Sequence, residues 1–106
     1  MAKAVLLVDD DEEFRMSLGE FLKAQGFPVV TAADGQDALA LLGTIEPPGM
    51  ILLDFMMPVM NGAQFLAAQR SDARLREIPV VLLSAGARDW RGEAVGVDAV
   101  LAKPVD

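Results

Sequence analysis

The chain has 106 residues, of which 53% are hydrophobic and 24% are charged, and its formal net charge is −7. This length fits one domain around a single core, and the apolar content excludes a disordered tail. So acidic a surface argues against direct contact with nucleic acid or an anionic membrane, and it suits metal ions and basic partners.

Cysteine and histidine are both absent from the sequence. Their absence excludes disulfides, thiolate and imidazole metal sites, Ser-His-Asp and Cys-His catalysis, and a phosphohistidine on this chain. Any chemistry must therefore use Asp, Glu, Lys, Ser or Thr. The apolar run before Asp9 spans only residues 4–8, which is too short for a signal peptide or a membrane span. We therefore expect a soluble cytoplasmic protein.

Short, unbroken apolar runs recur along the chain. Runs of this length are typical of strands that are covered on both faces, as in a parallel sheet. They predict strands over 4–8, 50–53, 80–83 and 99–102, and a weaker pattern adds a strand over 29–32.

Helical patterns lie between these runs, with capping residues at their ends. The apolar face of the first helix carries Phe14, Leu18, Phe21 and Leu22, and this helix stops at Gly26. The second helix is capped by Asp34, carries Ala38, Leu41 and Leu42, and ends at Gly43. The third is capped by Asn61 and carries Phe65, Leu66 and Ala68, and a short fourth helix spans 87–95 and contains Trp90. This alternation predicts an α/β fold with a doubly wound, five-stranded parallel sheet, for which the flavodoxin-like order 2-1-3-4-5 is the natural form.

Polar residues follow the carboxyl ends of the predicted strands, where open parallel sheets form their sites. Taken singly, each has an ordinary structural role, as a helix cap, a turn residue, a loop hydroxyl or a solvated lysine. Their joint placement favours a shared site made of Asp9, Asp10, Asp54, Ser84 and Lys103, whereas Asp11 is interpreted as the N-cap of the helix that follows.

The chemistry of this set is complementary. Crowded carboxylates repel one another unless a cation neutralises them, and Mg²⁺ prefers such oxygen ligands. A carboxylate can also act as a nucleophile and form an aspartyl-phosphate, whose oxygens a metal, a lysine and a hydroxyl would stabilise.

These residues lie in motifs that resemble the CheY-like receiver domains of two-component response regulators, along essentially the whole chain. The matching segments are 6–11 (Leu-Leu-Val-Asp-Asp-Asp), 33–39 (Ala-Asp-Gly-Gln-Asp-Ala-Leu), 54–62 (Asp-Phe-Met-Met-Pro-Val-Met-Asn-Gly), 79–85 (Pro-Val-Val-Leu-Leu-Ser-Ala) and 98–104 (Asp-Ala-Val-Leu-Ala-Lys-Pro). The resemblance implies a single receiver domain over residues 1–106.

The resemblance also implies roles for the site residues. Asp54 accepts a phosphoryl group from a phosphohistidine on a sensor histidine kinase or a histidine phosphotransfer protein. Mg²⁺ is bound by Asp10 directly, by Asp9 through water, by Asp54 and by the Met56 backbone carbonyl, while Ser84 and Lys103 contact the phosphoryl group. The domain then changes conformation and regulates an output domain or a downstream protein. It turns over no external substrate beyond its own phosphorylation and dephosphorylation.

Several positions depart from the family pattern. Val100 stands where an aromatic switch residue is usual, and neither Gly86 nor Met56 has a side chain that could position water against the phosphoryl group, which favours slow hydrolysis. The chain stops at Asp106, before the fifth helix of the family. We therefore expect an uncovered apolar face beside the first helix and a possible homodimer.

Two alternatives stay open at this point. One is a receiver-like interaction module that is not regulated by phosphorylation, which Val100 and the short fourth helix leave open. The other is a Mg²⁺-dependent aspartyl-phosphate phosphohydrolase of the haloacid-dehalogenase type. That class needs a second Asp two residues after the nucleophile, and Met56 occupies this position.

Overall fold

A computed structural model of the chain describes residues 3–54, 60, 62–84 and 99–102. Within these residues, five parallel strands form one sheet in the order β2-β1-β3-β4-β5, as the sequence predicts. The strands are β1 (Val5–Val8), β2 (Val29–Ala32), β3 (Met50–Asp54), β4 (Val80–Ser84) and β5 (Ala99–Ala102). β3 and β4 each run one residue beyond the apolar run that predicts them, so Asp54 and Ser84 are the last residues of their strands.

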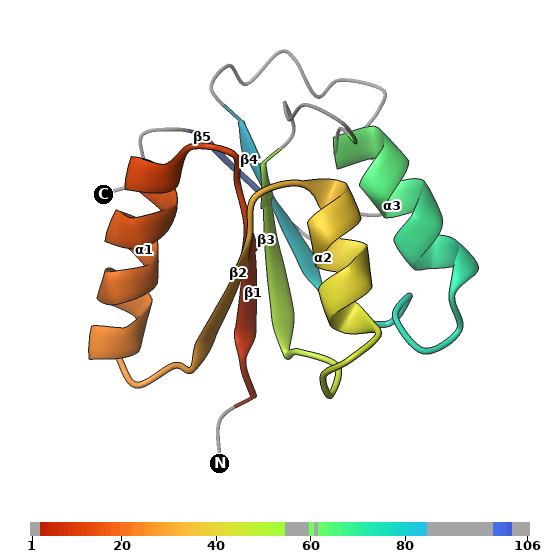
Figure 1. Cartoon of the computed structure of the whole chain (residues 1–106), viewed down its shortest axis with the longest axis horizontal. Helices are drawn as coiled ribbons and strands as arrows, with labels where there is room; N and C mark the ends of the chain where they lie inside the picture. The colour runs from red at the N-terminus through yellow and green to blue at the C-terminus, as the bar shows by residue number, and fades with distance from the viewer. Residues whose placement is uncertain (1–2, 55–59, 61, 85–98, 103–106) are drawn as a thin grey trace.

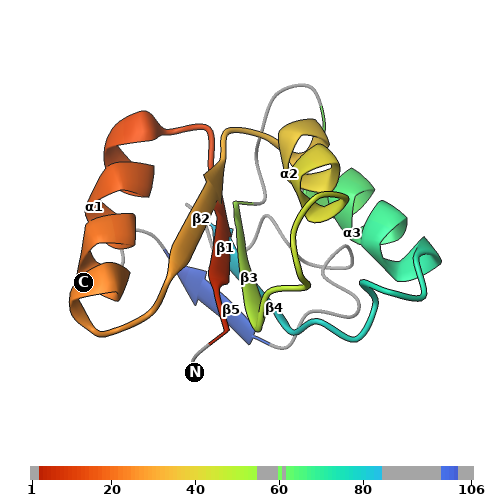
Figure 2. The same cartoon turned by 60° about the horizontal axis from the view of Figure 1, so that its bottom comes forward.

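Helices cover both faces of this sheet. α1 (Glu12–Ala24) lies on one face, and α2 (Gly35–Leu42) and α3 (Gly62–Ser71) lie on the other (Figure 1). The same layers are visible after rotation (Figure 2). The fourth helix predicted over 87–95 and the Asn61 cap fall outside the described residues. Within the part of the chain that is described, no helix combines the length and the apolar character needed to cross a membrane.

Side-chain caps define where the first two helices begin. The Asp11 carboxylate accepts a hydrogen bond from the Phe14 amide at 3.2 Å, and the Asp34 carboxylate accepts one from the Asp37 amide at 2.8 Å. Both caps confirm the sequence prediction, because a carboxylate satisfies an amide that has no partner within the helix. Beyond the C-cap of α1, Gly26 adopts a φ of 97°, a left-handed conformation that glycine adopts without steric cost.

The central strand β1 divides the core between the two faces. Leu6 and Val8 belong to a large cluster under α2 and α3, whereas Val5 and Leu7 belong to a smaller cluster under α1. Side chains of a strand alternate between faces, so apolar residues are needed at every position when both faces are covered. This requirement explains the unbroken apolar runs in the sequence.

One predicted core residue on α1 is largely exposed. Phe14, Leu18 and Leu22 pack against the cluster under α1, but Phe21 is 55% exposed. Consecutive helix residues are about 100° apart around the axis, so Phe21 lies to one side of the buried stripe that ends at Leu22. The sequence-based expectation that Phe21 shares this buried stripe is therefore wrong. Together with Phe27 and Met50 it borders an apolar hollow of about 240 Å³.

Polar side chains hold the loops at the amino ends of the strands in place. The buried amide of Gln69 in α3 donates to the carbonyl oxygens of Leu75 at 2.8 Å and Ile78 at 3.1 Å. Arg74 donates to the Leu42 carbonyl at the end of α2, at 2.6 Å. The amino ends of the strands are thus held by structural contacts, which leaves the carboxyl ends as the place to look for chemistry.

Candidate functional site

An acidic pocket lies where β1 and β3 end. Val8 of β1 pairs in register with Leu53 of β3, so the next residues, Asp9 and Asp54, are neighbours across the two strands. One carboxylate oxygen from each of Asp9, Asp10 and Asp54 can be chosen so that all three lie within 4.8 Å of one another. The fold therefore brings together three of the carboxylates that the sequence places at this edge.

The three carboxylates differ sharply in burial. Asp9 is fully buried and Asp54 is 5% exposed, while Asp10 faces solvent. Burying a charged carboxylate costs free energy unless hydrogen bonds or an opposite charge compensate, and neighbouring negative charges add repulsion. A cation that enters from the exposed side at Asp10 would meet both requirements.

Hydrogen bonds fix the backbone and one carboxylate oxygen of Asp9. Its amide donates to the carbonyl of Ala32 in β2 at 3.1 Å, and its carbonyl accepts from Nη1 of Arg15 at 2.7 Å. Its Oδ1 accepts from the amide of Asp11 at 2.9 Å. Asp11 is thus both the N-cap of α1 and a partner of the pocket. Sequence reasoning missed Arg15, whose only signal is a basic residue near the start of an acidic helix.

The donor set of the pocket fits Mg²⁺. All three side chains offer hard oxygen ligands, and the chain has no histidine or cysteine that would favour zinc or copper. Oxygens bound to one octahedral Mg²⁺ lie roughly 3–4 Å apart, so a cluster within 4.8 Å needs only small side-chain rotations or a bridging water. The residues present are therefore able to hold this ion.

The other predicted site residues are described only in part. Ser84 is the last residue of β4, next to β3, and its backbone lies in register with Ala102 of β5. Lys103 follows Ala102 in the chain and lies outside the described residues, as does Met56. The roles predicted for Ser84, Lys103 and Met56 stay predictions, and so does the role of Val100 in the switch.

A parallel sheet in the order 2-1-3-4-5, with helices on both faces and an acidic pocket at its carboxyl edge, defines a flavodoxin-like α/β domain. The family profile described as the response regulator receiver domain matches residues 5–106. The chain therefore belongs to the response regulator receiver domains, the modules of two-component signalling.

Individual relatives agree with this assignment. Response regulator Rre1 of Synechocystis sp. is 39% identical over an alignment of 109 positions. The alignment covers 97% of this chain and 46% of Rre1, so the chain spans about half the length of that relative. The structure of the chemotaxis protein CheY4 of Vibrio cholerae aligns over 100% of this chain and 90% of its own, with a TM-score of 0.91 and 33% identity.

A further solved structure bears on the metal. The receiver domain of the sensor histidine kinase PA1611 from Pseudomonas aeruginosa aligns with a TM-score of 0.90 and 26% identity, over 100% of this chain and 88% of that one. That structure contains a magnesium ion coordinated in its active-site cleft. The likeness covers the whole chain, including the edge of the sheet that carries the acidic pocket.

Proposed function

We propose that this chain is a phosphoacceptor domain in which Asp54 takes up a phosphoryl group with the help of Mg²⁺. The observation that carries the proposal is the acidic pocket, in which the nearly buried Asp54 lies within 4.8 Å of Asp9 and Asp10 at the carboxyl edge of the sheet. Asp9, Asp10, Asp54 and the Met56 backbone carbonyl hold the ion. The ion offsets negative charge on the carboxylates and on the phosphoryl oxygens.

The position of Asp54 between two strands suits this reaction. β3 lies between β1, which the acidic pair Asp9 and Asp10 follows, and β4, which ends in Ser84. An Asp54 oxygen attacks the phosphorus atom, the bond from phosphorus to the donor breaks, and the donor leaves with the electron pair. Ser84 and Lys103 would stabilise the phosphoryl oxygens through a hydroxyl group and a positive charge.

The donor histidine lies outside this chain. The chain contains no histidine, so the phosphohistidine that supplies the group belongs to a sensor histidine kinase or a histidine phosphotransfer protein. The likeness to the receiver domain of a sensor histidine kinase supports this class of partner. The phosphorylated domain then favours a second conformation, which an output domain or a downstream protein recognises. The reaction is directed at the chain itself rather than at an external substrate.

A small-molecule phosphodonor tests the proposal without the partner kinase. Incubation of the chain with acetyl phosphate and Mg²⁺ should add the mass of one phosphoryl group, measured by intact-protein mass spectrometry. The Asp54→Asn variant should stay unmodified, while Asp37→Asn, which changes an exposed carboxylate of α2 in the same way, should be modified as in the wild type. Equal modification of the Asp54→Asn variant contradicts the assignment.

A further inference from the structure

We infer that Arg15 is a positioning residue for the metal site: its guanidinium holds the main chain of Asp9 so that the Asp9 carboxylate faces Asp10 and Asp54. The inference rests on the proposed function, because it takes the acidic pocket to be a Mg²⁺ site. It adds a residue outside the ligand set and gives α1 a direct part in setting the affinity for the ion.

The contact from Arg15 completes the restraint on the Asp9 peptide groups. Nη1 of Arg15 donates to the Asp9 carbonyl at 2.7 Å, and the residue is half-buried, which limits competition from water. The Asp9 amide donates to Ala32 in β2. The main chain of Asp9 is therefore held by β2 through its N–H group and by α1 through its C=O group.

The start of α1 also orients the Asp9 side chain. The Asp11 amide donates to Oδ1 of Asp9 at 2.9 Å, and the Asp11 carbonyl accepts from the Arg15 amide, also at 2.9 Å. Arg15 thus contacts the residue on each side of Asp10 in the chain. If its side chain releases Asp9, the Asp9 carbonyl loses its hydrogen bond to α1, and the contact of the Asp11 amide with the Asp9 carboxylate is left to orient the pocket from this side.

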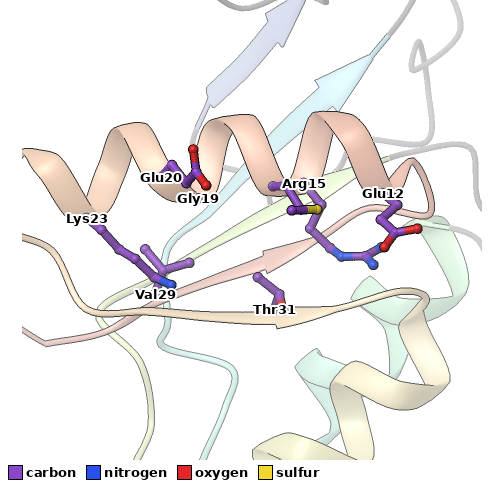
Figure 3. A pocket seen from close by; sticks show the side chains of 8 residues that line it. Glu12, Arg15, Gly19, Glu20, Lys23, Val29 and Thr31 are labelled. Carbon is purple, nitrogen blue, oxygen red and sulfur yellow. The ribbon is translucent and has the colours of Figure 1, made fainter.

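The placement of Arg15 is unfavourable for the helix alone. Arg15 is the fourth residue of α1, near the positive end of the helix dipole, where Glu12 and Glu13 are favoured and a cation is not. Side chains of a helix point toward its N-terminus, so Arg15 reaches back over the first turn, on the side of α1 that faces β2 (Figure 3). A residue that is placed against the preference of its helix is typical of a functional site.

A purely electrostatic role makes the opposite prediction. A guanidinium that acted only as a positive charge near the pocket would compete with Mg²⁺, so its removal would tighten metal binding. A guanidinium that positions Asp9 strengthens metal binding, so its removal would weaken it. The sign of the change therefore separates the two roles.

The test compares Mg²⁺ binding in three variants. Arg15→Met removes the hydrogen-bond donor and the positive charge, and Arg15→Lys keeps the charge and one donor group. The control, Arg76→Met, replaces an exposed arginine between α3 and β4 by the same residue. The dissociation constant for Mg²⁺ is measured from backbone amide chemical shifts of Asp10 and Asp11, and unfolding is followed by circular dichroism without the ion. We expect about a tenfold weaker affinity in Arg15→Met, as for loss of an outer-shell partner, partial recovery in Arg15→Lys and no change in Arg76→Met.

The outcomes separate this inference from the proposed function. Equal or tighter Mg²⁺ binding by a folded Arg15→Met protein overturns the role of Arg15 and leaves the metal site standing. If Arg15→Met does not fold, Arg15→Gln is measured in its place, because glutamine lacks the charge but keeps a shorter hydrogen-bond donor. Weaker Mg²⁺ binding by Arg15→Gln than by the wild type supports the positioning role. Equal or tighter binding overturns that role. Absence of Mg²⁺-dependent shifts at Asp10 and Asp11 in the wild type overturns the metal site and the inference together.

Discussion

Asp9 and Asp54 continue the register of β1 and β3, so two buried carboxylates stand side by side at the carboxyl edge of the sheet. Asp10 adds a third carboxylate on the solvent side, within the same 4.8 Å cluster. This arrangement concentrates negative charge where the sheet holds the backbone firmly. The three carboxylates therefore suit the binding of a divalent cation and the formation of the acyl phosphate proposed for Asp54.

The repulsion among the three carboxylates predicts that Asp10→Asn changes the thermal stability of the domain in different ways without and with Mg²⁺. Without Mg²⁺, the variant should be more stable than the wild type, because one of three repelling charges is gone. A gain of up to about 1 kcal/mol corresponds to a rise in Tm of roughly 4–8 °C for a domain of this size. With Mg²⁺, the wild type should gain more stability than the variant, because bound ligand stabilises the folded state. Thermal unfolding with and without the ion measures both effects, with Asp37→Asn as the control; an unchanged response to Mg²⁺ in Asp10→Asn would remove Asp10 from the site.

Gln69 is predicted to be a stability residue with no part in the site. Its buried amide satisfies the carbonyl oxygens of Leu75 and Ile78, so Gln69→Leu leaves both without this donor. We expect a loss of about 1–3 kcal/mol in the free energy of unfolding. Urea denaturation measures it, and Gln36→Leu on the exposed face of α2 serves as the control, with an expected change within about 0.5 kcal/mol. Equal unfolding free energies for the two variants would show that these hydrogen bonds add little.

The predicted homodimer stays a prediction, and the apolar hollow beside α1 supplies a way to test it. Phe21 and Phe27 border the hollow and are 55% and 43% exposed. Exposed apolar surface of this kind favours association. Sedimentation should show concentration-dependent self-association that Phe21→Lys weakens. Met16→Lys, on the same helix and 57% exposed, lines a different hollow, next to β2, and should behave as the wild type. A wild-type chain that stays monomeric at high concentration would refute the dimer.

Much of the fold could be predicted from local chemistry. The strands over 29–32 and 99–102 have the predicted bounds. The pattern of β2 is the weaker one because β2 is an edge strand in which Thr31 is exposed. Asp11 and Asp34 mark their helices because a carboxylate caps free amides. The extension of β3 to Asp54 was not predicted, since pairing there depends on backbone hydrogen bonds, which a hydropathy pattern does not reveal.

The remaining features depend on tertiary geometry. The pocket itself could be predicted, because parallel strands bring the residues after their carboxyl ends to one edge. Arg15 could not, since its contact with the Asp9 carbonyl depends on the path of the loop between β1 and α1. Phe21 was misplaced because helical spacing gives the width of an apolar stripe only approximately, and packing decides which residue at its border is buried.

Chemical mapping of the phosphoryl group tests the central claim most directly. Borohydride reduces the acyl phosphate of an aspartate to the alcohol of homoserine in two steps. A first hydride adds to the carbonyl carbon and phosphate leaves, and a second hydride reduces the resulting aldehyde to the alcohol. After treatment with acetyl phosphate and Mg²⁺, reduction and proteolysis, peptide mass spectrometry should find homoserine at position 54 and aspartate at positions 9 and 10. Homoserine at Asp9 or Asp10, or at no position despite a phosphorylated chain, would contradict the assignment of Asp54 as the phosphoacceptor.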